Sequence, residues 1–115
     1  MNARLDVAEA ETAGLKDLEA RAGEAAQLLK LLANEKRLLI LCHLIARQEM
    51  TVGALNQAID LSQSALSQHL ARLREDGLVA FRRESQTIHY RVADPKAARL
   101  IEVLKDLFCP DLPSS

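Results

Sequence analysis

One short stretch, residues 62–78, specifies both the ends and the faces of a helix. Ser62 is a favourable N-cap, and Gly77 lies where a helix commonly ends in a left-handed conformation. Three leucines recur at spacings of four and three and therefore share one apolar face: Leu66, Leu70 and Leu73. The opposite face carries small and polar side chains: Ser64, Ser67, Gln68, Ala71 and Glu75. A short helix with this outer face is suited to contact another surface through hydrogen bonds.

The next segment, residues 78–92, changes the period of the apolar positions from 3.6 to 2, which predicts a β-hairpin. The polar run from Glu84 to Gln86 supplies its turn. Its charged side chains comprise three arginines and one glutamate: Arg82, Arg83, Arg91 and Glu84. A helix with a polar outer face beside a basic hairpin predicts contact with DNA, with the helix in the major groove.

Two shorter helices are expected before this stretch. Asn34 can cap a helix over residues 35–47, and Thr51 begins a third helix after a short connection at residues 48–50. Two short helices, a tight turn and a helix with a polar outer face form the helix-turn-helix pattern. With the hairpin, the pattern predicts a mainly α fold with a small β-hairpin, which is a winged helix-turn-helix.

Amphipathic helices are expected at both ends of the chain. Apolar residues keep helical spacing from Ala13 to Ala33, although Gly23 makes a break possible. Asp94 caps a last helix, with Pro95 at its first position. Because this last helix has a broad apolar face close to the chain end, we expect it to pack against a second subunit.

The length and composition favour one domain. The chain has 115 residues, and we divide it into a flexible N-terminal tail, one domain and a C-terminal tail: residues 1–12, 13–109 and 110–115. The net charge of −1 disfavours nucleic-acid binding through the overall charge of the protein. Any attraction to DNA must therefore come from the locally basic hairpin. The longest apolar run, Leu38 to Cys42, is too short for a membrane span, and the N-terminus lacks a signal-peptide core. A cytoplasmic location is the expectation.

Two stretches resemble a known family: LLKLLANEKRLLIL, and TVGALNQAIDLSQSALSQHLARLREDGLVAFRRESQTIHYRV. Over residues 25–107 the chain is similar to the ArsR/SmtB family of bacterial winged-helix repressors. The resemblance implies a homodimer, with the first and last helices at the interface. It also implies binding to a partly palindromic operator in double-stranded DNA, and release from that DNA when an inducer arrives.

The resemblance also implies individual DNA contacts. In the helix-turn-helix, the candidates for base and phosphate contacts are Ser62, Gln63, Ser64, Ser67 and Gln68. In the wing, the candidates near the adjacent minor groove or backbone are Arg82, Arg83 and Gln86. The alternative for each is a solvated side chain without a DNA contact, and for Arg72 and Arg74 the two interpretations are equally good. Arginines would supply most of the salt-dependent affinity.

The two metal sites common in this family have no counterpart here. Metal sensors place a Cys-x-Cys pair in the helix before the one that reads DNA (the recognition helix, which corresponds here to residues 62–78), or Asp, His and Glu ligands on the last helix. Here those segments are GALNQAI and DPKAARLIEVLKDL, and neither contains Cys or His. His69 lies at the edge of the leucine face, where a packed structural histidine is the better interpretation. Because a metal site needs three or more ligands, we expect no metal and no cofactor.

Cys42 and Cys109 remain as candidate sensing thiols. Without a secretory signal, they are expected to be reduced. The pair resembles that of the persulfide-responsive BigR/SqrR-like repressors, which use one cysteine on the second helix and one on the last. The resemblance implies a dithiol-based repressor that binds operator DNA when reduced and is released when persulfide or polysulfide links the two cysteines. The alternatives are a response to arsenite, another thiophile or general oxidation, and a pair of inert thiols.

Two other classes of function fit the sequence less well. An enzyme is disfavoured because the sequence has no CxxC motif, no evident arrangement of Cys, His and an acid, and few aromatic residues to line a pocket. A purely structural interaction module would lack salt-dependent DNA binding. We therefore expect a DNA-binding regulator that is not an enzyme.

Overall fold

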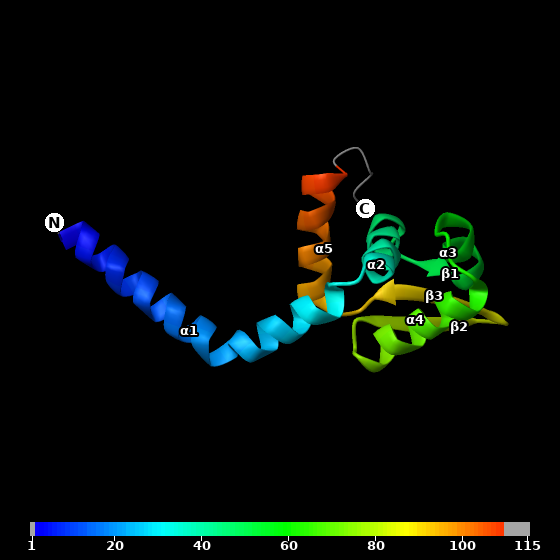
Figure 1. The fold of residues 1–115 in the computed structure, drawn as a ribbon, viewed down its shortest axis with the longest axis horizontal. Helices are drawn as coiled ribbons and strands as arrows, with labels where there is room; N and C mark the ends of the chain where they lie inside the picture. The colour runs from blue at the N-terminus through cyan, green and yellow to red at the C-terminus, as the bar shows by residue number, and fades with distance from the viewer. Residues whose placement is uncertain (1, 110–115) are drawn as a thin grey trace. The chain divides into compact units, whose positions relative to one another are not determined.

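The computed structural model describes the backbone of residues 2–109 and the side chains of residues 13–109 (Figure 1). The chain forms two compact units, one extending to Leu31 and the other beginning at Leu32. The first unit is helical throughout its described residues, and the second contains the remaining helices and the sheet.

Helix α1, Asn2–Leu32, begins well before the expected start at Ala13 and continues without a break through Gly23. For residues 1–12 the sequence allows a flexible tail or a frayed helix start, and the backbone is helical from residue 2, which agrees with the second interpretation. Alanine, leucine, glutamate and arginine have high intrinsic helix propensity, which favours a helix even where no apolar period is present. The division into tails and a domain over residues 13–109 otherwise stays a prediction, and the tail at 110–115 lies outside the described residues.

The second unit has the fold predicted for a winged helix-turn-helix. Its elements are α2 (Glu35–Arg47), β1 (Met50–Thr51), α3 (Val52–Ala58), α4 (Gln63–Glu75), β2 (Val79–Glu84), β3 (Thr87–Val92) and α5 (Pro95–Phe108). Helix α4 lies along strand β2, and α5 lies beside α2 (Figure 1). The mainly α fold with a small hairpin is therefore confirmed, while its dimeric assembly stays a prediction.

The predicted helix caps are present. The side chains of Asn34, Ser62 and Asp94 accept hydrogen bonds from backbone N–H groups in the first turns of α2, α4 and α5. Gly77 has a φ of 77°, the left-handed conformation expected after α4. Local hydrogen bonding and backbone conformation thus set the ends of the helices that carry the candidate site.

Strand β1 differs from the plain connection expected at residues 48–50. It pairs antiparallel with β3, with Met50 opposite Tyr90 and Thr51 opposite His89. The sheet order is β1-β3-β2, so β3 is the central strand. A two-residue strand is too short to show an alternating pattern, and it forms here because β3 offers backbone partners that are distant in the sequence.

The core of the second unit combines apolar side chains from α2 to α5 and from the start of the hairpin. Its largest fully buried side chains are Ile40, Leu41, Leu44, Leu55, Leu66, Leu70, Leu73, Leu78 and Ile101. The three leucines of the predicted apolar face of α4 are all among them. Their burial fixes the rotation of α4 about its own axis, and its polar face therefore lies outside.

Candidate DNA interface and thiol pair

The polar face of α4 is exposed to solvent. All five helix-turn-helix residues predicted to contact DNA lie at the surface: Ser62, Gln63, Ser64, Ser67 and Gln68. The helical period brings Ser64, Ser67 and Gln68 onto one outer face, opposite the buried leucines. The Oγ atom of Ser62 lies 3.0 Å from the backbone nitrogen of Ala65 and accepts its hydrogen bond. Ser62 therefore serves as the cap of α4, in addition to its predicted contact.

The wing residues predicted to contact DNA are exposed, but they differ in their partners. Arg83 lies near the hairpin turn and forms no ion pair with a described residue. The Nε atom of Arg82 lies 3.0 Å and 2.9 Å from the two carboxylate oxygens of Glu49. Its Nη1 atom lies 2.9 Å from Oε2 of Glu84. Glu49 carries no local signal in the sequence, because it is 33 positions from Arg82 and meets it only in the folded sheet.

These ion pairs shift the pKa values of all three groups. Hydrogen bonding and charge from Arg82 lower the pKa of Glu49 and the pKa of Glu84. The two carboxylates in turn raise the pKa of Arg82 above its ordinary range. All three side chains are therefore charged at neutral pH.

Arg72 and Arg74 have partners within the fold. The Nε atom of Arg72 lies 3.5 Å from Oδ2 of Asp76, one turn further along the chain. The guanidinium carbon of Arg74 lies 4.8 Å from the centre of the Phe81 ring, which is a cation–π contact between α4 and β2. The centroids of the Phe81 and Tyr90 rings lie 5.8 Å apart. Arg74 therefore helps to hold α4 against β2.

His69 is half-buried in α4, as expected for a histidine at the edge of the leucine face. Among the side chains that the structure describes, no group of three or more His, Cys, Asp or Glu residues is arranged to hold a metal ion. Over the same residues, no helix combines the length and apolarity needed to cross a membrane.

Cys42 and Cys109 are free thiols on two helices that pack together. Cys42 is half-buried within α2, whereas Cys109 is exposed at the C-terminal end of α5. Burial raises the pKa of the Cys42 thiol, and the charge of Cys109 raises it further. The fold thus brings the two cysteines within electrostatic range of each other, and Cys109 is the more accessible of the two.

Lys105 is a residue that the sequence pattern does not single out. Its side chain is 2% exposed, and it is the one charged residue that is buried in the described part of the chain. It lies one turn before Cys109, whose backbone N–H donates to the Lys105 carbonyl oxygen at 2.7 Å. Burial and Cys109 raise the pKa of the Cys42 thiol, and the positive charge of Lys105 partly offsets both effects.

Comparison with known proteins identifies the family. Residues 34–80 match the family described as bacterial regulatory protein, arsR family. The transcriptional activator HlyU of Vibrio cholerae is 48% identical over 95 residues, which cover 83% of this chain and 87% of HlyU. The chain belongs to the ArsR family. A second ArsR-type relative, the biofilm growth-associated repressor of Agrobacterium fabrum, is 50% identical over 95 residues, covering 83% of this chain and 80% of the relative.

The ArsR family assignment extends to the three-dimensional fold. The structure of reduced HlyU from Vibrio cholerae superimposes with a TM-score of 0.75 and 48% sequence identity, covering 82% of this chain and 98% of that chain. ArsR-family proteins of this kind are DNA-binding transcriptional regulators and not enzymes. The expectation of a non-enzymatic DNA-binding regulator is therefore confirmed.

In this ArsR-family protein, we predict that Lys105 promotes ionisation of Cys42. Lys105→Met removes the positive charge and keeps an unbranched side chain, so the pKa of the Cys42 thiol should rise. Alkylation of Cys42 by iodoacetamide at neutral pH should then slow, because the thiolate is the reactive form. Mass spectrometry of the separate peptides follows each cysteine, and Lys105→Arg, which keeps the charge, is the control. Equal alkylation rates for Lys105→Met and the unsubstituted protein would contradict the prediction.

Proposed function

We propose that this protein is a dithiol-based transcriptional repressor. It binds operator DNA while Cys42 and Cys109 are reduced, and it is released when reactive sulfur species link them. The observation that carries the proposal is the presence of two free thiols, one on α2 and one at the end of α5, on helices that pack together. The name of the Agrobacterium relative supports the repressor assignment. A cytoplasmic location fits both the DNA target and the reduced thiols.

Docking on DNA is proposed to use the outer face of α4 and the wing. The proposed contacts in α4 and its cap are Ser62, Gln63, Ser64, Ser67 and Gln68, and those in the wing are Arg82, Arg83 and Gln86. Serine and glutamine side chains can hydrogen-bond base edges in the major groove, while arginines bind phosphates. Exposure of all eight residues supports this arrangement.

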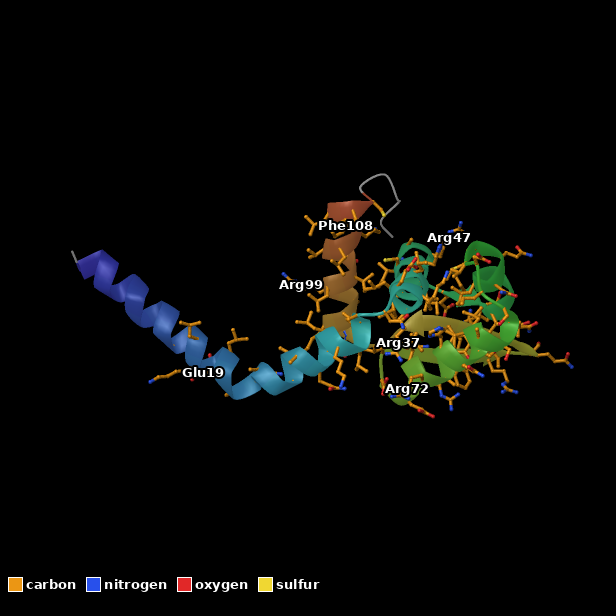
Figure 2. All side chains as sticks on the ribbon, in the orientation of Figure 1. Glu19, Arg37, Arg47, Arg72, Arg99 and Phe108 are labelled. Carbon is orange, nitrogen blue, oxygen red and sulfur yellow. The ribbon has the colours of Figure 1, made fainter. Side chains whose placement is uncertain are left out.

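A homodimer is proposed to present two such faces to one operator. Exposed leucines on α1 and exposed apolar residues on α5 support this assembly: Leu15, Leu18, Leu29, Val103, Leu107 and Phe108. Phe108, at the end of α5, is 77% exposed (Figure 2). When a second subunit covers an apolar ring that is this exposed, the free energy of the assembly falls. Two recognition helices must then lie one DNA turn apart, about 34 Å.

The chemistry of the switch begins at the more accessible thiol. The Cys109 thiolate attacks the terminal sulfur of a persulfide donor R–S–SH, which forms Cys109–S–SH and releases R–S⁻. The Cys42 thiolate then attacks the inner sulfur of that persulfide, so that a Cys42–Cys109 disulfide forms and HS⁻ leaves. The two thiols are oxidised and the donated sulfur is reduced to sulfide. If Cys42 carries a persulfide of its own, the same attack retains one extra sulfur and gives a trisulfide.

The bridge can act on DNA binding through the two helices that it joins. Cys42 lies in a core helix and Cys109 at the end of a helix proposed to form the dimer interface. Linking them changes how α5 sits against α2, and therefore the relative position of the two recognition helices. Because these helices must match the spacing of the DNA grooves, a small rotation is sufficient to weaken binding.

The test is DNA binding by reduced protein before and after treatment with an organic persulfide. We expect weaker binding after treatment, together with a mass that shows Cys42 and Cys109 joined directly or through added sulfur. Unmodified thiols and unchanged DNA affinity would overturn the proposal. Parallel samples treated with peroxide or arsenite distinguish the alternatives, because a stronger response to either would make the protein a general redox or thiophile-responsive repressor.

A further inference from the structure

The outer face of the wing sheet pairs its central arginine with two carboxylates. Arg82 donates from Nε to both oxygens of Glu49 at 3.0 Å and 2.9 Å, and from Nη1 to Glu84 at 2.9 Å. The Nε2 atom of His89 lies 3.8 Å from the same Glu84 oxygen. Arg82 is therefore the centre of an ion network on the wing, the same hairpin that is proposed to contact DNA.

The sheet topology makes this network non-local. Glu49 directly precedes β1, whereas Arg82 lies on β2, and the central strand β3 separates the two. Thr51 and Arg82 both lie opposite His89, so these three residues share one face of the sheet. Arg83 is the next residue along β2, and its side chain therefore projects from the other face. The two neighbouring wing arginines thus have different surroundings.

The ion pairs change what Arg82 can contribute to DNA binding. A phosphate must compete with two carboxylates that are already within hydrogen-bond distance of the guanidinium. Their negative charges also repel phosphates that approach this face of the wing. Arg82 lowers the pKa of both carboxylates, so Glu49 and Glu84 are both ionised at neutral pH. Sequence-independent DNA binding relies almost entirely on phosphate contacts. This network therefore weakens sequence-independent binding more than operator binding.

We propose that Glu49, together with Glu84, holds Arg82 on the wing and thereby suppresses sequence-independent DNA binding, so that Arg82 makes its proposed DNA contact only on the operator. Glu49 is then a residue that determines specificity by opposing a competing interaction. The inference rests on the DNA-binding part of the proposed function and is independent of the thiol switch. It implies that Arg83, which has no ion pair with a described residue, supplies more of the basal phosphate affinity than Arg82 does.

The experiment measures the affinity of each variant, with its thiols kept reduced, for a random-sequence DNA duplex over a range of salt concentrations. Glu49→Gln keeps the size of the side chain but removes its charge, which frees Arg82 for a phosphate. We expect binding at 0.1 M salt to tighten by roughly 3- to 10-fold, and the slope of log affinity against log salt to become steeper by about 0.9, as for one added phosphate contact. The gain should disappear in the double variant Glu49→Gln/Arg82→Gln.

Two further variants supply controls. Glu102→Gln removes the same charge from an exposed site on α5, so it measures the effect of net charge alone. Arg83→Gln is expected to weaken binding to the random duplex and to flatten the salt slope by about 0.9, whereas Arg82→Gln alone should change the slope little. Circular dichroism of each variant establishes that the fold is retained.

Two results would overturn the inference. One is the same affinity and slope for Glu49→Gln as for Glu102→Gln. The other is a slope that Arg82→Gln alone flattens by about 0.9, because Arg82 would then already contact a phosphate. Absence of salt-dependent DNA binding by the unsubstituted protein is a distinct result, since it would remove the proposed DNA-binding function and this inference with it.

Discussion

Cys42→Ser and Cys109→Ser are each expected to bind operator DNA as tightly as the reduced protein and to lose the response to a persulfide. A serine hydroxyl is close in size to a thiol, but it cannot form a bridge through sulfur. In the unsubstituted protein, we expect persulfide to lower operator affinity by about 5- to 150-fold, the range of a typical allosteric coupling of about 1–3 kcal/mol. Binding isotherms with and without donor measure this difference directly.

The expected size of the effect follows from what the bridge constrains. Closing a long loop between α2 and α5 restricts the unfolded chain by about 4 kcal/mol in the entropy model. Restricting the unfolded chain stabilises both folded conformations, the DNA-bound one and the free one. The part of this stabilisation that the two conformations share cannot change DNA affinity. Only the part that differs between the DNA-bound and free conformations contributes to release, and the coupling is therefore expected to be the smaller quantity.

The two serine variants also separate a sensor from a structural role. Cys109 is exposed, so Cys109→Ser should leave the stability unchanged within about 0.5 kcal/mol. Cys42 is half-buried, and Cys42→Ala provides a second variant that removes the sulfur without adding a hydroxyl. A persulfide response that persists in either single variant would refute a mechanism that needs both thiols. Reduced operator affinity in all Cys42 variants, with no donor present, would make that cysteine structural.

Leu70→Ala is expected to cause a large loss of stability. The Leu70 side chain is 1% exposed and lies in the centre of the apolar face of the helix. Removing a buried leucine side chain leaves a cavity and costs about 2–5 kcal/mol of the free energy of unfolding. Domains are commonly stable by only about 5–15 kcal/mol, so this one change takes a large share. Urea unfolding followed by circular dichroism measures the loss.

Gln68→Ala is the matched control on the exposed face of the same helix. Its free energy of unfolding should stay within about 0.5 kcal/mol of the original value, because no buried contact is removed. Operator affinity should nevertheless fall if Gln68 contacts DNA as proposed. Both variants must be compared at one protein concentration, since dimerisation would add to the apparent stability. A stability loss below about 1 kcal/mol for Leu70→Ala would show that the α4 face is not packed as described.

Many features of the helices in the second unit could be predicted because the forces that define them act over a few residues. Caps such as Asn34, Ser62 and Asp94 bond to backbone groups two or three positions away. The leucine period of α4 likewise assigns a buried and an exposed face from spacing alone. The predicted helix over residues 35–47 agrees with α2 at both ends.

Other features escaped prediction because they depend on residues distant in the sequence. Strand β1 exists only through its pairing with β3, and its two residues carry no period of their own. Helix α1 begins at Asn2, well before the apolar period at Ala13, because residues of high intrinsic helix propensity extend it beyond its amphipathic part. The buried position of Lys105 depends on how α5 packs, and no local pattern indicates it.

For this protein, the sequence by itself determined the helix-turn-helix and the wing, since apolar periods and helix caps are local. The family resemblance, which spans most of the chain, indicated the pair of cysteines as candidate sensors. Only the tertiary structure decided which charges meet. It joined Arg82 to Glu49 across the sheet and brought the charges of Lys105 and Cys109 close to Cys42. Electrostatic interactions depend on distances in space, and the packing of strands and helices sets those distances.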